Sequence, residues 1–248
     1  MRKDADTTMH SRDAHDLHTA CQREGCPVCT VVLENMDRVM DTWNYEGFTD
    51  VEHRQNLIRT RGFCPLHTWQ LAQRNNAFQL AIIYREVLSD LLEKMGGEQA
   101  QTTHALRSTE EHWLADVKHW FQPVSSTHEN ATQFFAGCSL CQTRTTLEQR
   151  VMGRLIDLLP SEEMQSLLRQ STGLCRLHFI QISQILSEHS SLHSILLASQ
   201  RICLQRVLDE VKELVRKHDY HANAEPRGDE MTAWRRAAEL CAGNLGVH

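Results

Sequence analysis

The sequence predicts an all-α protein in which one helical plan occurs twice. Apolar residues recur every three or four positions in most segments, and almost no segment shows the period of two that a half-buried strand requires. Four short motifs follow one another in the order CxxC, CxxH, CxxC, CxxH. These observations predict an internally duplicated helical protein. We expect each half to contain a CxxC helix, a short helix and a long helix that begins at CxxH.

The first half follows a polar leader, residues 1–20, that we expect to be a disordered tail. The first Cys3His repeat is predicted over residues 21–97. A short helix ends near Arg59, and a long helix runs from Pro65 to Gly96-Gly97, where glycine is expected to end it. The CxxC helix of this repeat has an apolar face, formed by Val28, Val32, Val39, Met40 and Trp43.

The second half repeats this plan. Residues 98–137 are predicted to form a connecting helix, with Trp113 and Trp120 on its apolar face, and a loop. The second Cys3His repeat is predicted over residues 138–218, with a first helix closed by Pro160, a short helix over 161–169, and a long amphipathic helix after Gly173. Residues 219–248 are expected to be a C-terminal extension with a short helix around Trp234.

The four motifs are CPVC at 26–29, CPLH at 64–67, CSLC at 138–141 and CRLH at 175–178. Chance would give about one such pair in a chain with this many cysteines and histidines. Corresponding residues are 112 positions apart in the two CxxC motifs and 111 apart in the two CxxH motifs. A single insertion or deletion therefore relates the halves, and the glycine two residues before each CxxH is also shared.

These motifs predict eight metal ligands. Three thiolates and one imidazole, with no oxygen donor, are typical of a closed tetrahedral zinc site with a structural role. Because the duplication keeps each half as a unit, we expect two zinc ions per chain, each bound within one half. The first set is Cys26, Cys29, Cys64 and His67, and the second is Cys138, Cys141, Cys175 and His178.

The prolines after two of these cysteines predict where the cysteines lie. Pro27 and Pro65 suit the first position of a helix, which makes Cys26 and Cys64 the N-cap residues. Unpaired backbone N–H groups and the positive end of the helix dipole favour a thiolate there. Both motifs are therefore expected at helix N-termini, where they can bind a cation.

The remaining candidate residues have simpler interpretations. Cys21, Cys203 and Cys241 have no partner at chelating spacing, so we interpret them as small buried apolar residues. The segment Lys217-His218-Asp219-Tyr220 is interpreted as a helix C-cap with cations near the negative helix end, and a catalytic cluster is the alternative. We find no set of nucleophile, base and orienting residue, so the sequence does not establish whether the protein is an enzyme.

Composition limits the partners and the compartment. The formal charge is −6 and there is no dense basic block, which disfavours nucleic-acid and membrane binding and leaves a protein partner open. The leader lacks the apolar stretch of a secretory signal, and no run approaches eighteen apolar residues. We therefore expect a cytoplasmic protein whose nine cysteines stay reduced.

The combined motifs resemble those of an uncharacterised bacterial family, the domain of unknown function numbered 6062. The family pattern is CPxC, GFCxxH, CxxC and GxCxxHF, followed by a lysine-rich helix end and a DYR-like segment. This chain has CPVC, GFCPLH, CSLC and GLCRLHF, then KHDYH at 217–221. Thr68 replaces an aromatic residue, His221 replaces an arginine, and Pro226-Arg227-Gly228 stands for a Pro-Trp-Gly-like stretch. The resemblance supports the ligand set and implies no activity.

Three functions are compatible with these motifs. The first is a zinc-stabilised helical scaffold or interaction module, which the closed ligand set favours. The second is an iron–sulfur or other redox metalloprotein, since thiolate-rich sites also bind clusters and a histidine can replace a cysteine. The third is a thiol oxidoreductase that uses Cys26 and Cys29, although the strand–helix–strand pattern of thioredoxin-like folds is missing.

Overall fold

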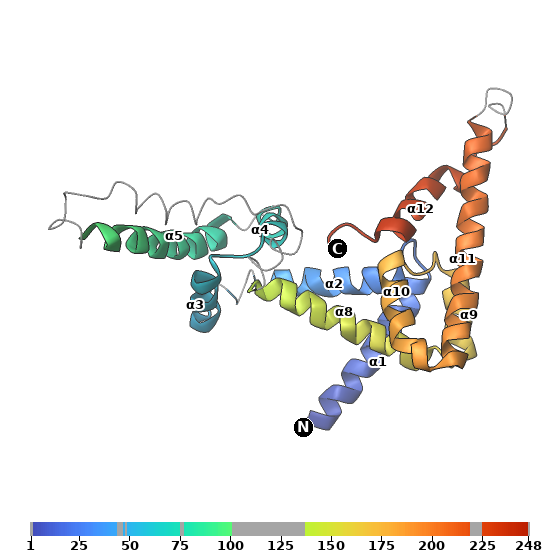
Figure 1. Ribbon diagram of the computed structural model, residues 1–248, viewed down its shortest axis with the longest axis horizontal. Helices are drawn as coiled ribbons and strands as arrows, with labels where there is room; N and C mark the ends of the chain where they lie inside the picture. Colours follow the sequence, from blue (N-terminus) through green and yellow to red (C-terminus); the bar gives the residue numbers. More distant parts are fainter. Residues whose placement is uncertain are drawn as a thin grey trace. The chain divides into compact units, whose positions relative to one another are not determined.

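The computed structural model describes residues 2–43, 47, 49–74, 77–100, 137–218 and 225–247 (Figure 1). Within these residues every regular element is a helix, which confirms the predicted all-α class. None of the described helices combines the length and the apolar character that a bilayer-spanning segment needs. The expected connecting helix and loop lie almost entirely in residues 101–136, outside the described part of the chain.

The chain divides into two compact units that do not coincide with the two halves of the sequence. One, which we call the terminal unit, comprises residues 1–37 and 144–248; the other, the central unit, comprises residues 38–143. The boundaries between the units fall inside two helices, α2 (Pro27–Thr42) and α8 (Ser139–Leu158). Each of these helices therefore begins in one unit and ends in the other.

The terminal unit is built around the long helix α11 (Ser190–Lys217), which packs against α9 (Glu162–Gln170) and α12 (Ala233–Ala242). Helix α10 (Arg176–Ile185), a 3₁₀ turn η3 (Leu186–Glu188) and a second turn η5 (Asp229–Thr232) complete it. Its core is aliphatic, with fully buried side chains that include Leu155, Leu159, Met164, Leu168, Leu174, Ile182 and Leu196.

The polar leader forms helix α1 (Arg2–Cys21), so the expectation of a disordered tail is wrong. One face of this helix carries Asp13, Leu17, Ala20 and Cys21, at helical spacing, and all four are buried. The Asp13 carboxylate lies 2.9 Å from Nε of Arg150 on α8. The apolar face is too short to stand out in the sequence, and contacts with other elements provide the stability that the sequence pattern does not show.

The central unit contains α3 (Val51–Thr60), α4 (Pro65–Ala72) and α5 (Ala77–Ala100). Helix α3 begins at the N-cap Asp50, whose side chain accepts a hydrogen bond from the backbone N–H of His53. Helices α3 and α5 pack together, and Leu57, Ile83 and Val87 are buried in this unit.

The prediction that each CxxH begins a long helix is wrong. Both CxxH motifs begin short helices, α4 and α10, and the long helices α5 and α11 follow separately. After α10 the chain passes through η3, and His189 has the non-helical angles φ −112° and ψ 73°. Gly96 and Gly97 do not end α5, which continues to Ala100. A glycine inside a helix costs only about 1 kcal/mol, so it does not by itself end one.

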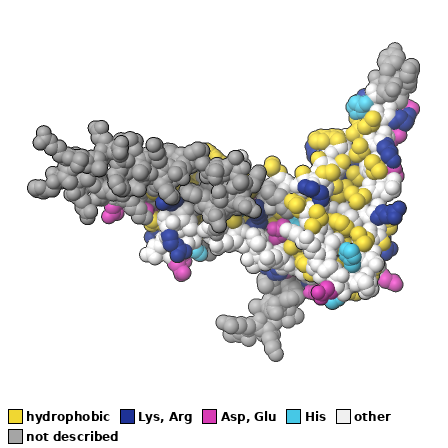
Figure 2. Space-filling model, in the orientation of Figure 1, with side chains coloured by type: hydrophobic (Ala, Val, Ile, Leu, Met, Phe, Trp, Pro, Cys, Tyr) yellow, Lys and Arg dark blue, Asp and Glu magenta, His cyan; other side chains and the backbone are white. Residues whose placement is uncertain are grey.

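One face of α11 exposes a row of apolar side chains. Leu197, Leu204, Leu208 and Val215 follow one another at intervals of seven, four and seven residues, and each is at least 45% exposed. These intervals place the four side chains within a narrow arc of the helix surface. Figure 2 shows hydrophobic side chains gathered on this part of the molecule.

Candidate metal centres

The structure gathers the eight predicted ligands into two groups of four. Within each group the donor atoms lie within 4.8 Å of one another. Site A contains Cys26, Cys29, Cys175 and His178, and all of its residues belong to the terminal unit. Site B contains Cys64, His67, Cys138 and Cys141, and all of its residues belong to the central unit.

The expected grouping within each half of the sequence is therefore wrong. Each CxxC motif is grouped with the CxxH motif of the other half. The reason is the course of α2 and α8. Each helix starts at its CxxC motif in one unit and carries the chain into the other unit, where the next CxxH motif lies.

Site A has one imidazole nitrogen facing three sulfur atoms. Nδ1 of His178 lies 3.5 Å from Sγ of Cys26, 3.4 Å from Sγ of Cys29 and 3.2 Å from Sγ of Cys175. The Sγ atoms of Cys29 and Cys175 are 3.8 Å apart. Each of the four residues is at most 2% exposed.

Site B has the same arrangement. Nδ1 of His67 lies 3.2 Å from Sγ of Cys64, 3.6 Å from Sγ of Cys138 and 3.4 Å from Sγ of Cys141. The Sγ atoms of Cys64 and Cys141 are 3.5 Å apart. Cys64, Cys138 and His67 are buried, whereas Cys141 is partly exposed.

These spacings match one tetrahedral ion. With zinc–sulfur bonds of about 2.3 Å and zinc–nitrogen bonds of about 2.1 Å, a tetrahedron separates two sulfurs by about 3.8 Å and a sulfur from a nitrogen by about 3.6 Å. The three sulfur–nitrogen separations and the one sulfur–sulfur separation given above for each site, 3.2 to 3.8 Å, lie at or slightly below these values, and all donors lie within 4.8 Å of one another. Each group of four donors could therefore hold one metal ion without rearrangement of the backbone.

All four motifs lie at helix N-termini, as predicted for Cys26 and Cys64. Cys64 and Cys175 are N-cap residues with nearly identical backbone angles, φ −63° and ψ 161° against φ −65° and ψ 158°. Helices α2 and α8 begin directly after Cys26 and Cys138. Each site thus faces two helix N-termini, whose positive ends favour thiolates and offset their charge.

A glycine turn leads into each CxxH motif. Gly62 and Gly173 have φ values of +97° and +99°, in the left-handed region that favours glycine. A Cβ atom on Gly62 would lie 2.8 Å from Cε1 of Tyr84 on α5, and one on Gly173 would lie 2.8 Å from Cβ of Cys203 on α11. Both backbone conformation and close packing therefore exclude a side chain at these positions.

Replacing Gly173 with alanine should destabilise the protein by about 1 to 3 kcal/mol, because it forces a left-handed alanine against Cys203. The free energy of unfolding measured in urea tests this expectation. Gly153→Ala is the matched control. Gly153 lies inside α8 with nothing within 4 Å of an added Cβ, so its replacement should stabilise by up to about 1 kcal/mol. Equal effects of the two substitutions would contradict the packing described for Gly173.

The sites share protons among their donors when no metal is bound. Burial lowers the pKa of His178, but hydrogen bonds with Cys175 and Cys29 outweigh it and raise the pKa to about 11. Hydrogen bonds with Cys138 and Cys64 likewise overcome burial and raise the pKa of His67 to about 9. Hydrogen bonds from neighbouring thiols hold the pKa of Cys138 and of Cys175 well below the ordinary value. A metal must therefore displace protons from each site as it binds.

Glu148 is a site residue that sequence analysis missed. Its Oε1 lies 2.7 Å from Nε2 of His178, and the glutamate is only 9% exposed. In the sequence, Glu148 stands out only as an acidic residue within about one helical turn of the apolar residues Leu147, Val151 and Met152, which are buried in the structure. Such a residue requires a partner, but the sequence does not say which.

The three cysteines outside the two sites differ in burial. Cys203 is buried and its thiol donates to the carbonyl of Leu168 at 3.2 Å, and Cys21 is also buried, as predicted. Burial, with Cys203 nearby, raises the pKa of Cys21 to about 12. Cys241, predicted to be buried, is exposed near the end of α12. No disulfide forms among the nine cysteines, all of which the structure describes.

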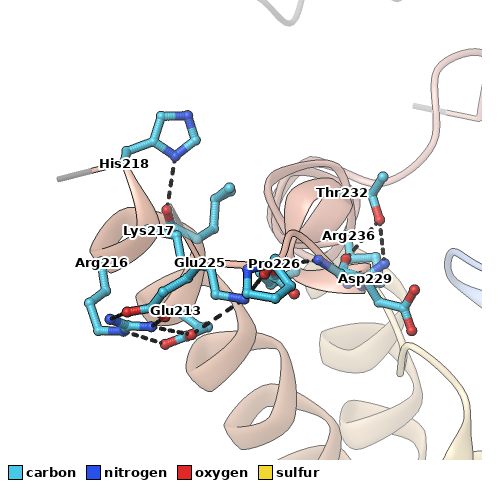
Figure 3. Close-up of polar contacts among 12 residues, drawn as sticks. Glu213, Arg216, Lys217, His218, Glu225, Pro226, Asp229, Thr232 and Arg236 are labelled. Atoms are coloured by element: carbon cyan, nitrogen blue, oxygen red, sulfur yellow. Dashed lines mark hydrogen bonds and ion pairs between the residues drawn. The ribbon is translucent and has the colours of Figure 1, made fainter. Parts of the chain in front are cut away.

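The segment after α11 is a helix end, as predicted (Figure 3). Nδ1 of His218 lies 2.9 Å from the carbonyl oxygen of Leu214, and Lys217 donates to the carbonyl of Pro226 and to Glu230. Arg216 pairs with Glu213 and Glu225. These contacts connect the end of α11 to η5. Asp219 and Tyr220 lie outside the described residues.

Comparison with known proteins agrees with the sequence motifs. The family model described as a family of unknown function (DUF6062) matches residues 5–247. A search of curated proteins and a search of solved structures each gave no match. The matched segment includes both sites and every described helix from α2 to α12. The chain is therefore a member of this family of unknown function, DUF6062.

Proposed function

We propose that sites A and B each bind one structural zinc ion and that the protein is a zinc-stabilised helical scaffold. The observation that carries this proposal is the close spacing of the four donor atoms in both sites, which supports coordination of a single tetrahedral ion. An iron–sulfur cluster distributes its ligands over several iron atoms, so it requires a wider spacing than a single ion. Three thiolates and one imidazole leave no position open for water, which favours a structural role over a catalytic one.

Burial disfavours a thiol oxidoreductase that uses the first CxxC motif. Cys26 and Cys29 are 2% and 0% exposed. Thiol–disulfide exchange needs a sulfur that a partner can reach. Both cysteines also lie against Cys175 and His178, which that function leaves without a role.

The scaffold part of the proposal is supported by the exposed apolar row on α11. Apolar side chains aligned on one exposed helix face are a feature of surfaces that bind another protein. We propose a protein as the partner, because the net charge of −6 disfavours nucleic acid and anionic membranes. We also propose a cytoplasmic location, since zinc–thiolate sites require reduced cysteines.

Elemental analysis of the full chain, purified under reducing and metal-free conditions, tests the zinc assignment. We expect two zinc ions per chain. Cys241→Ser is a matched control, because this exposed cysteine lies outside both sites, and it should leave both ions in place. A coloured protein that contains iron and no zinc would overturn the assignment, and so would a folded protein that contains no metal.

A further inference from the structure

We propose that the two sites bind zinc unequally, that Glu148 positions the histidine of site A, and that site B is the exchangeable site. This inference rests on the proposed function, because it concerns the same two ions. It follows from contacts that one site has and the other does not.

Glu148 fixes the imidazole of site A from the side opposite the sulfurs. Nδ1 of His178 faces the three cysteines, and Nε2 lies 2.7 Å from Oε1 of Glu148. A carboxylate that accepts the Nε2 proton holds the ring in one orientation and leaves the Nδ1 lone pair for the metal. Site A therefore presents its histidine in the orientation and tautomer that a zinc ion requires.

The carboxylate comes from an element that supplies no ligand to site A. The ligands of site A come from the starts of α2 and α10, whereas Glu148 lies in the middle of α8. Three helices therefore hold the four donors and their support in place. Movement of α10 relative to α8 would have to break this hydrogen bond between two buried groups.

The first half of the sequence has no acidic residue at the position that corresponds to Glu148. Glu148 follows Cys138, the first residue of its CxxC motif, by ten residues, and Met36 follows Cys26 by the same number. A methionine cannot replace a carboxylate as a strong acceptor. Among the described residues, no carboxylate lies within hydrogen-bond distance of the His67 ring.

Site B is also the more accessible of the two. Cys141 is partly exposed, whereas every ligand of site A is at most 2% exposed. A surface cavity of about 530 Å³ is lined by Thr60, Gly137 and Gln142, and the last two directly flank the CxxC motif of site B. A competing chelator or thiol reagent can therefore approach the ligands of site B from solvent.

Removal of such a supporting partner typically weakens metal binding by 10- to 100-fold. We therefore expect zinc to bind site B at least about tenfold more weakly than site A. Under a limiting concentration of chelator, the protein should pass through a state with one zinc ion, which site A retains. Site B would then exchange its metal with the cellular zinc pool while site A keeps its own.

Competition between zinc-loaded full-length protein and a chromophoric chelator tests the inequality. Cys175→Ser leaves only site B intact, and Cys138→Ser leaves only site A intact, so each release step can be assigned to a site. We expect the Cys175→Ser protein to release its remaining zinc at a lower chelator concentration than the Cys138→Ser protein. Equal affinities, or weaker binding by site A, would overturn the inference.

The role of Glu148 is tested in the same assay with site B as an internal control. Glu148→Ala should weaken site A by about 10- to 100-fold, and Glu148→Gln should weaken it less, because the amide keeps an acceptor oxygen. Asp157→Asn, an exposed acid on the same helix, should change neither site. Equal zinc affinity of site A in wild type and in the folded Glu148→Gln and Glu148→Ala proteins would overturn this role.

These outcomes separate the inference from the proposed function. A folded wild-type protein without zinc would refute the proposed function. Two tightly bound zinc ions of equal affinity, unaffected by Glu148→Ala, would refute only the inference. If Glu148→Ala does not fold, the comparison of the two intact sites and the Glu148→Gln protein still decide the question.

Discussion

Two double substitutions should leave different numbers of zinc ions, although each removes two cysteines. Cys29→Ser with Cys175→Ser removes two ligands from site A and should leave one zinc ion, in site B. Cys29→Ser with Cys64→Ser removes one ligand from each site and should leave no tightly bound zinc. Both sites lose a thiolate in the second protein, and a site with three protein ligands no longer matches a closed tetrahedral centre.

The measurement is the ratio of zinc to protein after dialysis against a chelator of intermediate affinity. The reciprocal pair provides a control, since Cys64→Ser with Cys141→Ser should leave one ion, in site A. If the ligands were instead grouped within each half of the sequence, the protein with Cys29→Ser and Cys64→Ser would keep one ion, and the protein with Cys29→Ser and Cys175→Ser would keep none. That result would refute the crosswise pairing and leave metal binding itself intact.

Removal of both zinc ions should unfold most of the protein. Structural zinc contributes about 10 to 16 kcal/mol in small zinc-finger peptides, whereas a whole domain is stable by only about 5 to 15 kcal/mol. Loss of either ion is therefore comparable with the entire stability of the unit that holds it. Circular dichroism during titration with a strong chelator should show a large loss of helicity, which added zinc restores and added magnesium does not.

A single-site variant makes this expectation more specific. Cys64→Ser should halve the zinc content and remove amide-exchange protection mainly in the central unit, because site B lies within that unit. The terminal unit keeps site A and its own buried side chains, and it should retain its protection. A metal-free protein with unchanged helicity and melting temperature would contradict a structural role and indicate a redox or catalytic one.

The sequence picked out the eight residues that the structure gathers into two clusters but predicted their grouping wrongly, and the difference has a physical cause. Metal ligands are a local property, because Cys64 and His67 must lie one helical turn apart to bind the same ion. Grouping depends instead on where α2 and α8 carry the chain, and nothing in the four motifs distinguishes one CxxC partner from the other. The glycine turn before each CxxH and the N-cap position of Cys64 are local in the same way, and both were predictable.

The other differences from the predictions also arise from tertiary contacts. Helix α1 has too few apolar residues to be recognised, but Leu17 and Ala20 are buried in the folded unit. Nothing in the sequence distinguishes Glu148 from other acidic residues on helices, and only the fold places it against His178. The exposure of Cys241 likewise depends on which face of α12 packs against α11.

The crosswise pairing has a consequence for the order in which the chain is synthesised. Site B is nested inside site A in the sequence, so the first CxxC emerges from the ribosome long before its own CxxH at 175–178. The motif at 64–67 emerges first and offers the same donors. Cys29 is 35 residues from Cys64 and 146 residues from Cys175, and the shorter loop costs about 1.3 kcal/mol less entropy to close. If the chain binds zinc as proposed, an ion that binds during synthesis would favour a mispaired site. The pairs seen in the structure would then form through late metal delivery or through ligand exchange after the second half has emerged.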